Sequence, residues 1–209
     1  MGKEKKLYFI TDSTDLDETA FLKKVEQACM GGIDLLQLRE KDLSDRELLE
    51  LAQKVKKIAD LYDVPMFIDD RIDIALIVGC HVHLGQTDIP IRYAKQLLPE
   101  GTMIGATAKT VEQALEAEKE GASYLGVGAI YPTTTKVVTV LTEVSTLNDI
   151  CNAVKIPVYA IGGLDRSNLE VLQGLPIEGI CVVSAIMKAN DPKQATQDLK
   201  EMMLYTLSH

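Results

Sequence analysis

The segment Pro157-Val158-Tyr159-Ala160-Ile161-Gly162 is an almost uninterrupted apolar run, and Gly179-Ile180-Cys181-Val182-Val183-Ser184 repeats the pattern further along the chain. Half-exposed strands alternate apolar and polar residues, whereas the strands of a parallel sheet covered by helices are apolar on both faces. These two segments therefore predict buried parallel strands.

Similar short apolar runs alternate with longer amphipathic segments over the whole chain. A helix is predicted at Ser44–Leu61, where Ser44 and Glu47 form a capping-box pattern and apolar residues recur with helical spacing. Further helices are predicted at Thr19–Met30, Thr110–Glu120 and Asp191–Leu204. The predicted strands are Leu7–Thr11, Asp34–Arg39, Pro65–Asp69, His81–Gly85, Met103–Thr107, Tyr124–Ala129, Pro157–Gly162 and Gly179–Ser184.

Eight strand–helix units in 209 residues predict an α/β protein, a single (β/α)8 TIM barrel with eight parallel strands, at the compact end of the size range of that fold. A doubly wound open sheet is the alternative. No linker, low-complexity segment or change of composition divides the chain. We therefore expect one barrel domain over residues 1–209, with flexible ends at 1–6 and 206–209.

The chain is acidic, with 22 Lys and Arg against 31 Asp and Glu and a net charge of −9. This balance argues against a general nucleic-acid binder, which needs a basic face, but a few local cations can still attract an anionic substrate. No signal-peptide pattern opens the chain, and no apolar run approaches the roughly 20 residues that span a bilayer. We expect a soluble, cytoplasmic protein without a membrane partner. Its four cysteines, Cys29, Cys80, Cys151 and Cys181, are expected to be buried thiols in a reducing compartment.

Charged and hydroxyl residues gather directly after the predicted strands, which is where a barrel carries its active site. Arg39 and Lys41 are two residues apart, so an extended segment points both to the same side. Lys136 ends the threonine-rich run Thr133-Thr134-Thr135. Three cations with threonine hydroxyls suit a diphosphate. The alternative for Arg39 and Lys41 is a solvated charge run that includes Glu40.

Asp70 and Asp88 follow adjacent predicted strands and can share a cation. Hard oxygen ligands in small number suit Mg²⁺, which bridges carboxylate and phosphate oxygens. The alternative for Asp70 is the N-cap of a helix over Ile72–Val78. His81 and His83 share one strand face without a third ligand, so we expect structural histidines rather than a metal site.

Gly162-Gly163 follows the seventh predicted strand and Ser184 the eighth. The loops after these two strands are the usual phosphate site of a barrel, and glycine lets backbone N–H groups approach a ligand closely. We interpret these loops as a phosphate site, with a plain turn as the alternative for the glycine pair.

Six motifs extend this pattern over nearly the whole chain, from Tyr8 to about Pro192. They are Gln37-Leu38-Arg39-Glu40-Lys41, Asp69-Asp70-Arg71-Ile72-Asp73-Ile74-Ala75, His83-Leu84-Gly85-Gln86-Thr87-Asp88, Gly126-Val127-Gly128-Ala129-Ile130-Tyr131-Pro132-Thr133-Thr134-Thr135-Lys136, Ala160-Ile161-Gly162-Gly163-Leu164 and Val183-Ser184-Ala185-Ile186. In this order they resemble the thiamine-phosphate synthase family.

The resemblance implies a Mg²⁺-dependent transferase that joins 4-amino-2-methyl-5-(diphosphomethyl)pyrimidine to a thiazole phosphate, giving thiamine phosphate and diphosphate. The expected partners of the protein are these small-molecule substrates, and the resemblance is compatible with a homo-oligomer. The implied metal ligands are Asp70 and Asp88, and the implied catalytic residues are Arg39, Lys41, Lys136 and Thr107. The implied substrate contacts are Gln37, Leu38, Arg39, Glu40, Lys41, Asp69, Thr107, Thr133, Thr134, Thr135, Lys136, Gly162, Gly163, Val183 and Ser184.

The chain departs from the family pattern at four places. The segment Val137–Ser145 is more apolar than usual and lacks the expected glycine, and Ala129 stands where proline is common. Asp69 stands where Asn is usual and adds a negative charge beside the expected diphosphate, and Thr107 replaces a usual serine while keeping the hydroxyl. The alternatives are a thiazole tautomerase-like relative, which relies on a histidine where this chain has Lys109, and a catalytically idle paralogue that binds phosphorylated ligands. A further alternative is another phosphate-binding barrel enzyme, such as an epimerase or aldolase. No Schiff-base lysine inside a predicted strand supports it.

Overall fold

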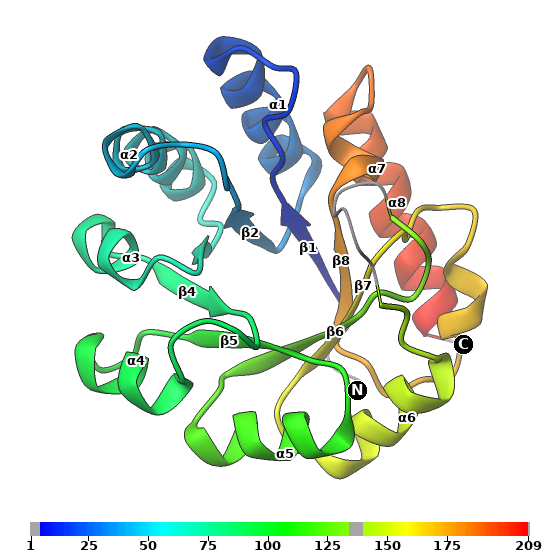
Figure 1. Cartoon of the computed structure of the whole chain (residues 1–209). Helices are drawn as coiled ribbons and strands as arrows, with labels where there is room; N and C mark the ends of the chain where they lie inside the picture. Colours follow the sequence, from blue (N-terminus) through cyan, green and yellow to red (C-terminus); the bar gives the residue numbers. More distant parts are fainter. Residues whose placement is uncertain (1–4, 134–139, 209) are drawn as a thin grey trace.

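The computed structural model describes residues 5–133 and 140–208. Within these residues eight parallel strands pair in chain order, and the last strand closes on the first. Figure 1 shows the strands around a common centre with the helices outside them. The predicted (β/α)8 barrel is confirmed, and the alternative of an open sheet is wrong.

Strands and helices alternate along the chain, except that β7 and β8 are joined through a short 3-10 helix, η1, and a short α7 precedes the final helix. The strands are β1 (Lys6–Ile10), β2 (Leu35–Leu38), β3 (Met66–Asp69), β4 (His81–Leu84), β5 (Ile104–Ala108), β6 (Tyr124–Gly128), β7 (Val158–Ile161) and β8 (Gly179–Val182). The helices are α1 (Glu18–Gly31), α2 (Asp45–Leu61), α3 (Ile72–Val78), α4 (Ile91–Leu97), α5 (Val111–Glu120), α6 (Val144–Ala153), η1 (Leu169–Leu172), α7 (Ser184–Met187) and α8 (Pro192–Leu207).

Local signals in the sequence position several of these elements. The Ser44 hydroxyl accepts from the Glu47 backbone N–H, and the Glu47 side chain accepts from the Ser44 N–H, so the predicted capping box starts α2. Of the ends expected to be flexible, residues 1–4 and 209 lie outside the described residues. Lys6 belongs to β1 and pairs with Gly179, and Thr206 and Leu207 are buried in α8, so these residues are part of the fold.

Alternate residues of each strand face two different cores. In β1, Leu7 and Phe9 point outward to the layer between strands and helices, whereas Tyr8 and Ile10 point into the barrel. The barrel interior is filled by one compact group of side chains, so the strands enclose a packed core rather than a channel. Its members are Tyr8, Ile10, Leu35, Phe67, Tyr124, Tyr159 and Cys181.

The aromatic rings of this inner core fit because the neighbouring strand β5 has a glycine, Gly105, at the position that faces them. A Cβ added at Gly105 in β5 would lie 2.1 Å from the Tyr124 ring. The Tyr124 ring instead meets Tyr8 and Tyr159 edge-on, with centroids 5.7 and 5.5 Å apart. This packing closes the barrel below the carboxyl ends of the strands.

The described helices include none long and apolar enough to cross a membrane. The cysteines are free thiols; Cys29, Cys80 and Cys181 are buried as expected, whereas Cys151 is half-buried on α6. Burial raises the pKa of Cys29 and Cys80 to about 12.

Candidate active site

A cavity of about 330 Å³ opens at the carboxyl ends of the strands, above the aromatic core. All eight strands contribute at least one residue to its wall. Because the strands are parallel, their carboxyl ends meet at one end of the barrel, and short loops bring distant parts of the sequence together there.

Most of the predicted site residues within the described part of the chain line this cavity. They are Gln37, Arg39, Lys41, Asp69, Asp70, Asp88, Thr107, Thr133, Gly162, Gly163, Val183 and Ser184. Two do not: Leu38 is buried against the helices, and the Glu40 carboxylate turns to the hydroxyls of Thr11 and Ser13. Thr134, Thr135 and Lys136 lie outside the described residues.

The cations from the loop after β2 meet the carboxylates that follow β3. Lys41 Nζ lies 2.6 Å from Asp69 Oδ2 and also pairs with Asp70, and Arg39 Nε lies 3.7 Å from the same Asp69 oxygen. The prediction that Arg39 and Lys41 face one side is therefore confirmed. The alternative of a solvated charge run does not describe Arg39, which is 18% exposed and paired with Asp69, whereas Lys41 keeps 44% of its side chain exposed.

Asp70 and Asp88 come together as the sequence predicts. Their side chains are hydrogen-bonded, and Asp88 Oδ2 also accepts from the Gly85 N–H at 2.5 Å. Asp70 has a left-handed backbone with φ 63°, an uncommon conformation often found at functional sites. The N-cap of α3 is Arg71, without a side-chain cap, so the alternative role of Asp70 as a helix cap is wrong.

The three carboxyl groups on this side have different proton affinities. Burial first, and then the charge of Asp70, raise the pKa of Asp69 above its ordinary value, although Lys41 opposes this. Burial also acts to raise the pKa of Asp70, but hydrogen bonds with Asp88 and Lys41 outweigh it and lower that pKa. Burial and the hydrogen bond to Asp70 raise the pKa of Asp88. Asp70 is therefore the carboxylate that stays ionised most readily.

The Asp70–Asp88 pair fits a magnesium ion. Two adjacent carboxylates at the cavity wall supply hard oxygen ligands of the kind that Mg²⁺ prefers, and they would hold the ion together with water and phosphate oxygens. Among the described residues no group of three His, Cys, Asp or Glu side chains is placed to hold a metal by itself. Water molecules and ligand oxygens would therefore supply the rest of the coordination.

A chain of hydrogen bonds crosses the floor of the cavity. Gln37 Nε2 donates to the Tyr8 hydroxyl at 3.0 Å, and the Tyr8 and Tyr124 hydroxyls lie 2.7 Å apart. His83 Nδ1 lies 3.0 Å from the Tyr124 hydroxyl, and His83 Nε2 lies 3.0 Å from Thr107 Oγ1. The chain thus joins five strands of the barrel.

Of the residues in this chain of hydrogen bonds, only the first and the last, Gln37 and Thr107, were assigned to the site from the sequence. The expectation of structural histidines holds for His81, whose Nδ1 accepts from the Met103 N–H at 3.1 Å. His83 in contrast lines the cavity. Its position near the carboxyl end of a predicted strand is a signal that could have found it, because that end of each strand faces the site.

The glycine loops lie across the barrel from the charged cluster. Gly162 and Gly163 have φ of 105° and 65°, and a Cβ on Gly162 would lie 2.3 Å from the Ala129 Cβ. Glycine is therefore required for the loops after β6 and β7 to approach each other so closely. Val183 and Ser184, at the start of α7, line the same end of the cavity.

A closed parallel barrel with cations and paired carboxylates on one side of its mouth and glycine loops on the other has the layout of a (β/α)8 barrel enzyme. Residues 7–186 match the family model described as thiamine monophosphate synthase. The chain is 47% identical over 193 residues to "Thiamine-phosphate synthase 2" of Streptococcus pneumoniae serotype 4, covering 92% of each. It is 45% identical over 207 residues to the thiamine-phosphate synthase of Enterococcus faecalis, covering 99% of this chain and 96% of the relative.

A solved thiamine phosphate pyrophosphorylase from Pyrococcus furiosus shares the fold with a TM-score of 0.87 and 38% identity, over 98% of both chains. The chain belongs to the thiamine monophosphate synthase family. It is accordingly a transferase of the thiamine-phosphate synthase type, and the resemblance drawn from its motifs is confirmed.

Proposed function

We propose that this thiamine-phosphate synthase joins a pyrimidine, carried as its diphosphomethyl derivative, to a thiazole phosphate in a Mg²⁺-dependent reaction. The observation that carries the proposal is the layout of the cavity. Arg39, Lys41 and the Asp70–Asp88 pair lie on one side, and the loops at Gly162-Gly163 and Ser184 lie on the other. Two phosphorylated substrates can therefore bind with their reacting ends toward each other.

The diphosphate is the leaving group, and its departure is the step that the protein must assist. Arg39 and Lys41 neutralise the negative charge that grows on it, and Lys136 is predicted to join them. Asp70 and Asp88 would hold the Mg²⁺, which when bound stabilises the same charge. The pyrimidine amino group can share the positive charge that develops on the carbon losing its diphosphate.

The floor of the cavity orients the pyrimidine. Gln37 and Thr107 are the ends of the hydrogen-bond chain and present polar atoms to the cavity, while Tyr8 supplies an apolar ring beneath them. A ring held between a fixed amide and a fixed hydroxyl has little rotational freedom, so the carbon bearing the diphosphate stays aimed at the second substrate.

The thiazole nitrogen is already a nucleophile, so the reaction needs no strong general base. The required work is to hold the thiazole phosphate at a fixed distance. Backbone donors around Gly163 and Ser184, with the Thr133 hydroxyl, are the proposed contacts for its phosphate. The predicted contacts from Thr134 and Thr135 belong to the same group.

A tautomerase-like activity is less well supported. Lys109, which stands where that relative needs a histidine, lines the cavity, and the residues suited to a diphosphate are retained.

We also propose that the enzyme works in the cytoplasm, because free thiols persist in a reducing compartment. A homo-oligomer stays a prediction.

The test is an assay of diphosphate release with both substrates, with each substrate omitted, and with Mg²⁺ removed by a chelator. We expect release only when both substrates and the metal are present. Release from the pyrimidine substrate alone would indicate a hydrolase, and binding of both substrates without release would indicate an idle paralogue. Release that survives complete chelation would contradict the metal assignment.

A further inference from the structure

Asp69, one of the implied substrate contacts, is a carboxylate in the cavity wall to which the proposed reaction assigns no step. It ends β3, and only 11% of its side chain is exposed. Its Oδ2 atom lies 2.6 Å from Lys41 Nζ and 3.7 Å from Arg39 Nε. The two cations assigned to the diphosphate are thus both held by one carboxylate.

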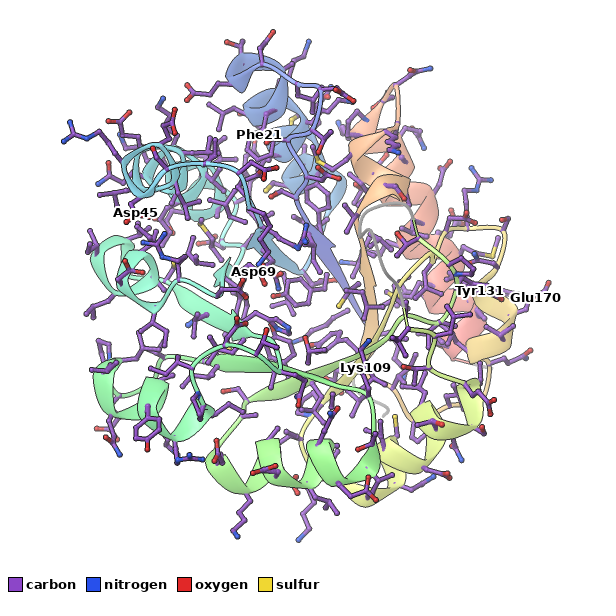
Figure 2. The ribbon with its side chains drawn as sticks, in the orientation of Figure 1. Phe21, Asp45, Asp69, Lys109, Tyr131 and Glu170 are labelled. Carbon is purple, nitrogen blue, oxygen red and sulfur yellow. The ribbon has the colours of Figure 1, made fainter. Side chains whose placement is uncertain are left out.

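Packing alone does not hold Lys41 in this place. Its side chain is 44% exposed, and its ammonium forms ion pairs with both Asp69 and Asp70. Figure 2 shows Asp69 toward the middle of the barrel, in contrast to Asp45 on the outer helix α2. Asp69 therefore acts from inside the site.

The charges on this side of the cavity do not favour an anion by themselves. Among the described residues here, Lys41 pairs with Asp69 and Asp70, Arg39 pairs with Asp69, and Asp88 adds a third carboxylate to the wall. The other described cation in the cavity wall is Lys109, which follows β5. A divalent cation on Asp70 and Asp88 would compensate those two carboxylates and release Lys41 from Asp70. Asp69 would still face both cations, at the positions where a diphosphate needs them.

We infer that Asp69 is an internal competitor of the diphosphate: it occupies Arg39 and Lys41 in the empty site and weakens the hold of the site on a diphosphate anion. The inference rests on the proposed function, because it assumes that the diphosphate binds at these cations. The diphosphate must displace Asp69 from its partners and bind beside its negative charge. Asp69 therefore hastens release of the product diphosphate and makes its binding depend on the metal.

The experiment is calorimetric titration of inorganic pyrophosphate into the wild-type chain and into Asp69→Asn, each with Mg²⁺ and with a chelator. The substitution keeps the shape of the side chain and removes one negative charge within contact distance of both cations. We expect Asp69→Asn to bind pyrophosphate at least about tenfold more tightly with Mg²⁺, since a unit charge a few ångströms away acts strongly in a partly buried site. Binding without Mg²⁺ should also become measurable. Inhibition of turnover by pyrophosphate should strengthen by the same factor.

Asp45→Asn is the matched control. Asp45 pairs with Arg71 at 2.7 Å, is 84% exposed, and does not line the cavity, so the same change of charge there should leave pyrophosphate affinity unaltered. Asp69→Ser is a second variant that removes the charge by a different side chain. It keeps the test valid where the asparagine variant fails to fold, and tighter binding in either variant supports the inference because structural damage does not increase affinity.

Unchanged or weaker pyrophosphate binding in folded Asp69→Asn, with wild-type binding intact, would overturn the inference and leave the proposed function standing. Weaker binding would mean that Asp69 holds Lys41 in the position that the diphosphate uses. Failure of the wild-type chain to bind pyrophosphate with Mg²⁺ would overturn the proposed diphosphate site and this inference with it.

Discussion

His83 Nε2 lies 3.0 Å from Thr107 Oγ1, at the end of the hydrogen-bond chain that crosses the floor of the cavity. The Gln37 amide donates to the Tyr8 hydroxyl, and the remaining links join hydroxyls and ring nitrogens that can each donate or accept. Tyr124 on β6 is thus connected through His83 on β4 to Thr107 on β5.

Tyr124→Phe removes the hydroxyl that links Tyr8 to His83. We expect kcat/KM for the pyrimidine substrate to fall about tenfold and the free energy of unfolding to fall by about 1–3 kcal/mol, because two buried polar groups lose their partner. Tyr159→Phe is the control, since Tyr159 packs in the same aromatic group outside this chain. Both variants are compared in turnover assays and urea denaturation. Equal effects of the two substitutions would contradict the proposal that the chain of hydrogen bonds orients the substrate.

Arg39→Ala removes a cation from the diphosphate side of the cavity. Loss of charge stabilisation for the leaving group should lower kcat by at least about tenfold. The measurement is diphosphate release at saturating substrates. Arg92→Ala, which breaks a pair with Glu120 on the outside of the barrel, is the matched control and should turn over at the wild-type rate. A wild-type kcat for Arg39→Ala would remove this residue from the leaving-group site.

Asp88→Asn leaves Asp70 as the only carboxylate of the predicted metal pair. The Mg²⁺ concentration that gives half-maximal activity should rise by about tenfold or more, because Mg²⁺ depends on charged oxygen ligands. A magnesium titration of diphosphate release measures this. Asp73→Asn, whose side chain pairs with Arg71 at 2.6 Å, serves as control. If both variants need the same Mg²⁺ concentration as the wild type, Asp88 is not a ligand.

Gly162→Ala places a Cβ where the Ala129 side chain already lies, at a φ of 105°. Strain at this φ costs about 1–3 kcal/mol, and the clash adds to it, so urea should unfold the variant at a clearly lower concentration. KM for the thiazole phosphate should also rise, because the loop forms that end of the cavity. Gly174→Ala isolates the effect of φ, since φ there is 76° and no atom lies within 4 Å of the new Cβ. Equal destabilisation of both variants would show that the close approach to Ala129 is unimportant.

Glu40→Gln tests a buried carboxyl next to the site. Burial raises the pKa of Glu40, although hydrogen bonds from Ser13 and Thr11 oppose this. A carboxyl whose pKa is raised by folding stabilises the fold at low pH, and this contribution is lost as pH rises through the raised value. From about pH 4 to pH 7 the wild type should therefore lose stability relative to Glu40→Gln, as measured by urea denaturation.

Glu47→Gln should show the opposite change of stability with pH. The capping-box hydrogen bonds with Ser44 lower the pKa of Glu47, so its contribution is present at neutral pH and is lost as pH falls through the lowered value. The wild type should gain stability relative to this variant over the same pH interval. The same direction of change in both variants would contradict the assignment for Glu40.

Local sequence patterns determined the succession of elements and much of the site. Ser44 and Glu47 mark the start of α2 because a capping box needs only residues three apart. The parallel strands place Arg39, Asp70 and Asp88 at one end of the barrel, since every residue that follows a strand lies at that end. These predictions needed chain direction and spacing, both of which can be read from the sequence.

Only the tertiary structure decided which groups pair within that end. Tyr8 and Tyr124 are 116 positions apart and meet because the barrel closes, and Asp69 meets Lys41 because β2 and β3 are neighbours at a particular register. Glu40 follows Arg39 in the chain yet turns to Thr11 and Ser13 instead. Hydrogen bonds and ion pairs depend on separations of about 3 Å. Spacing along the chain does not specify distances of that size, whereas the closed barrel does.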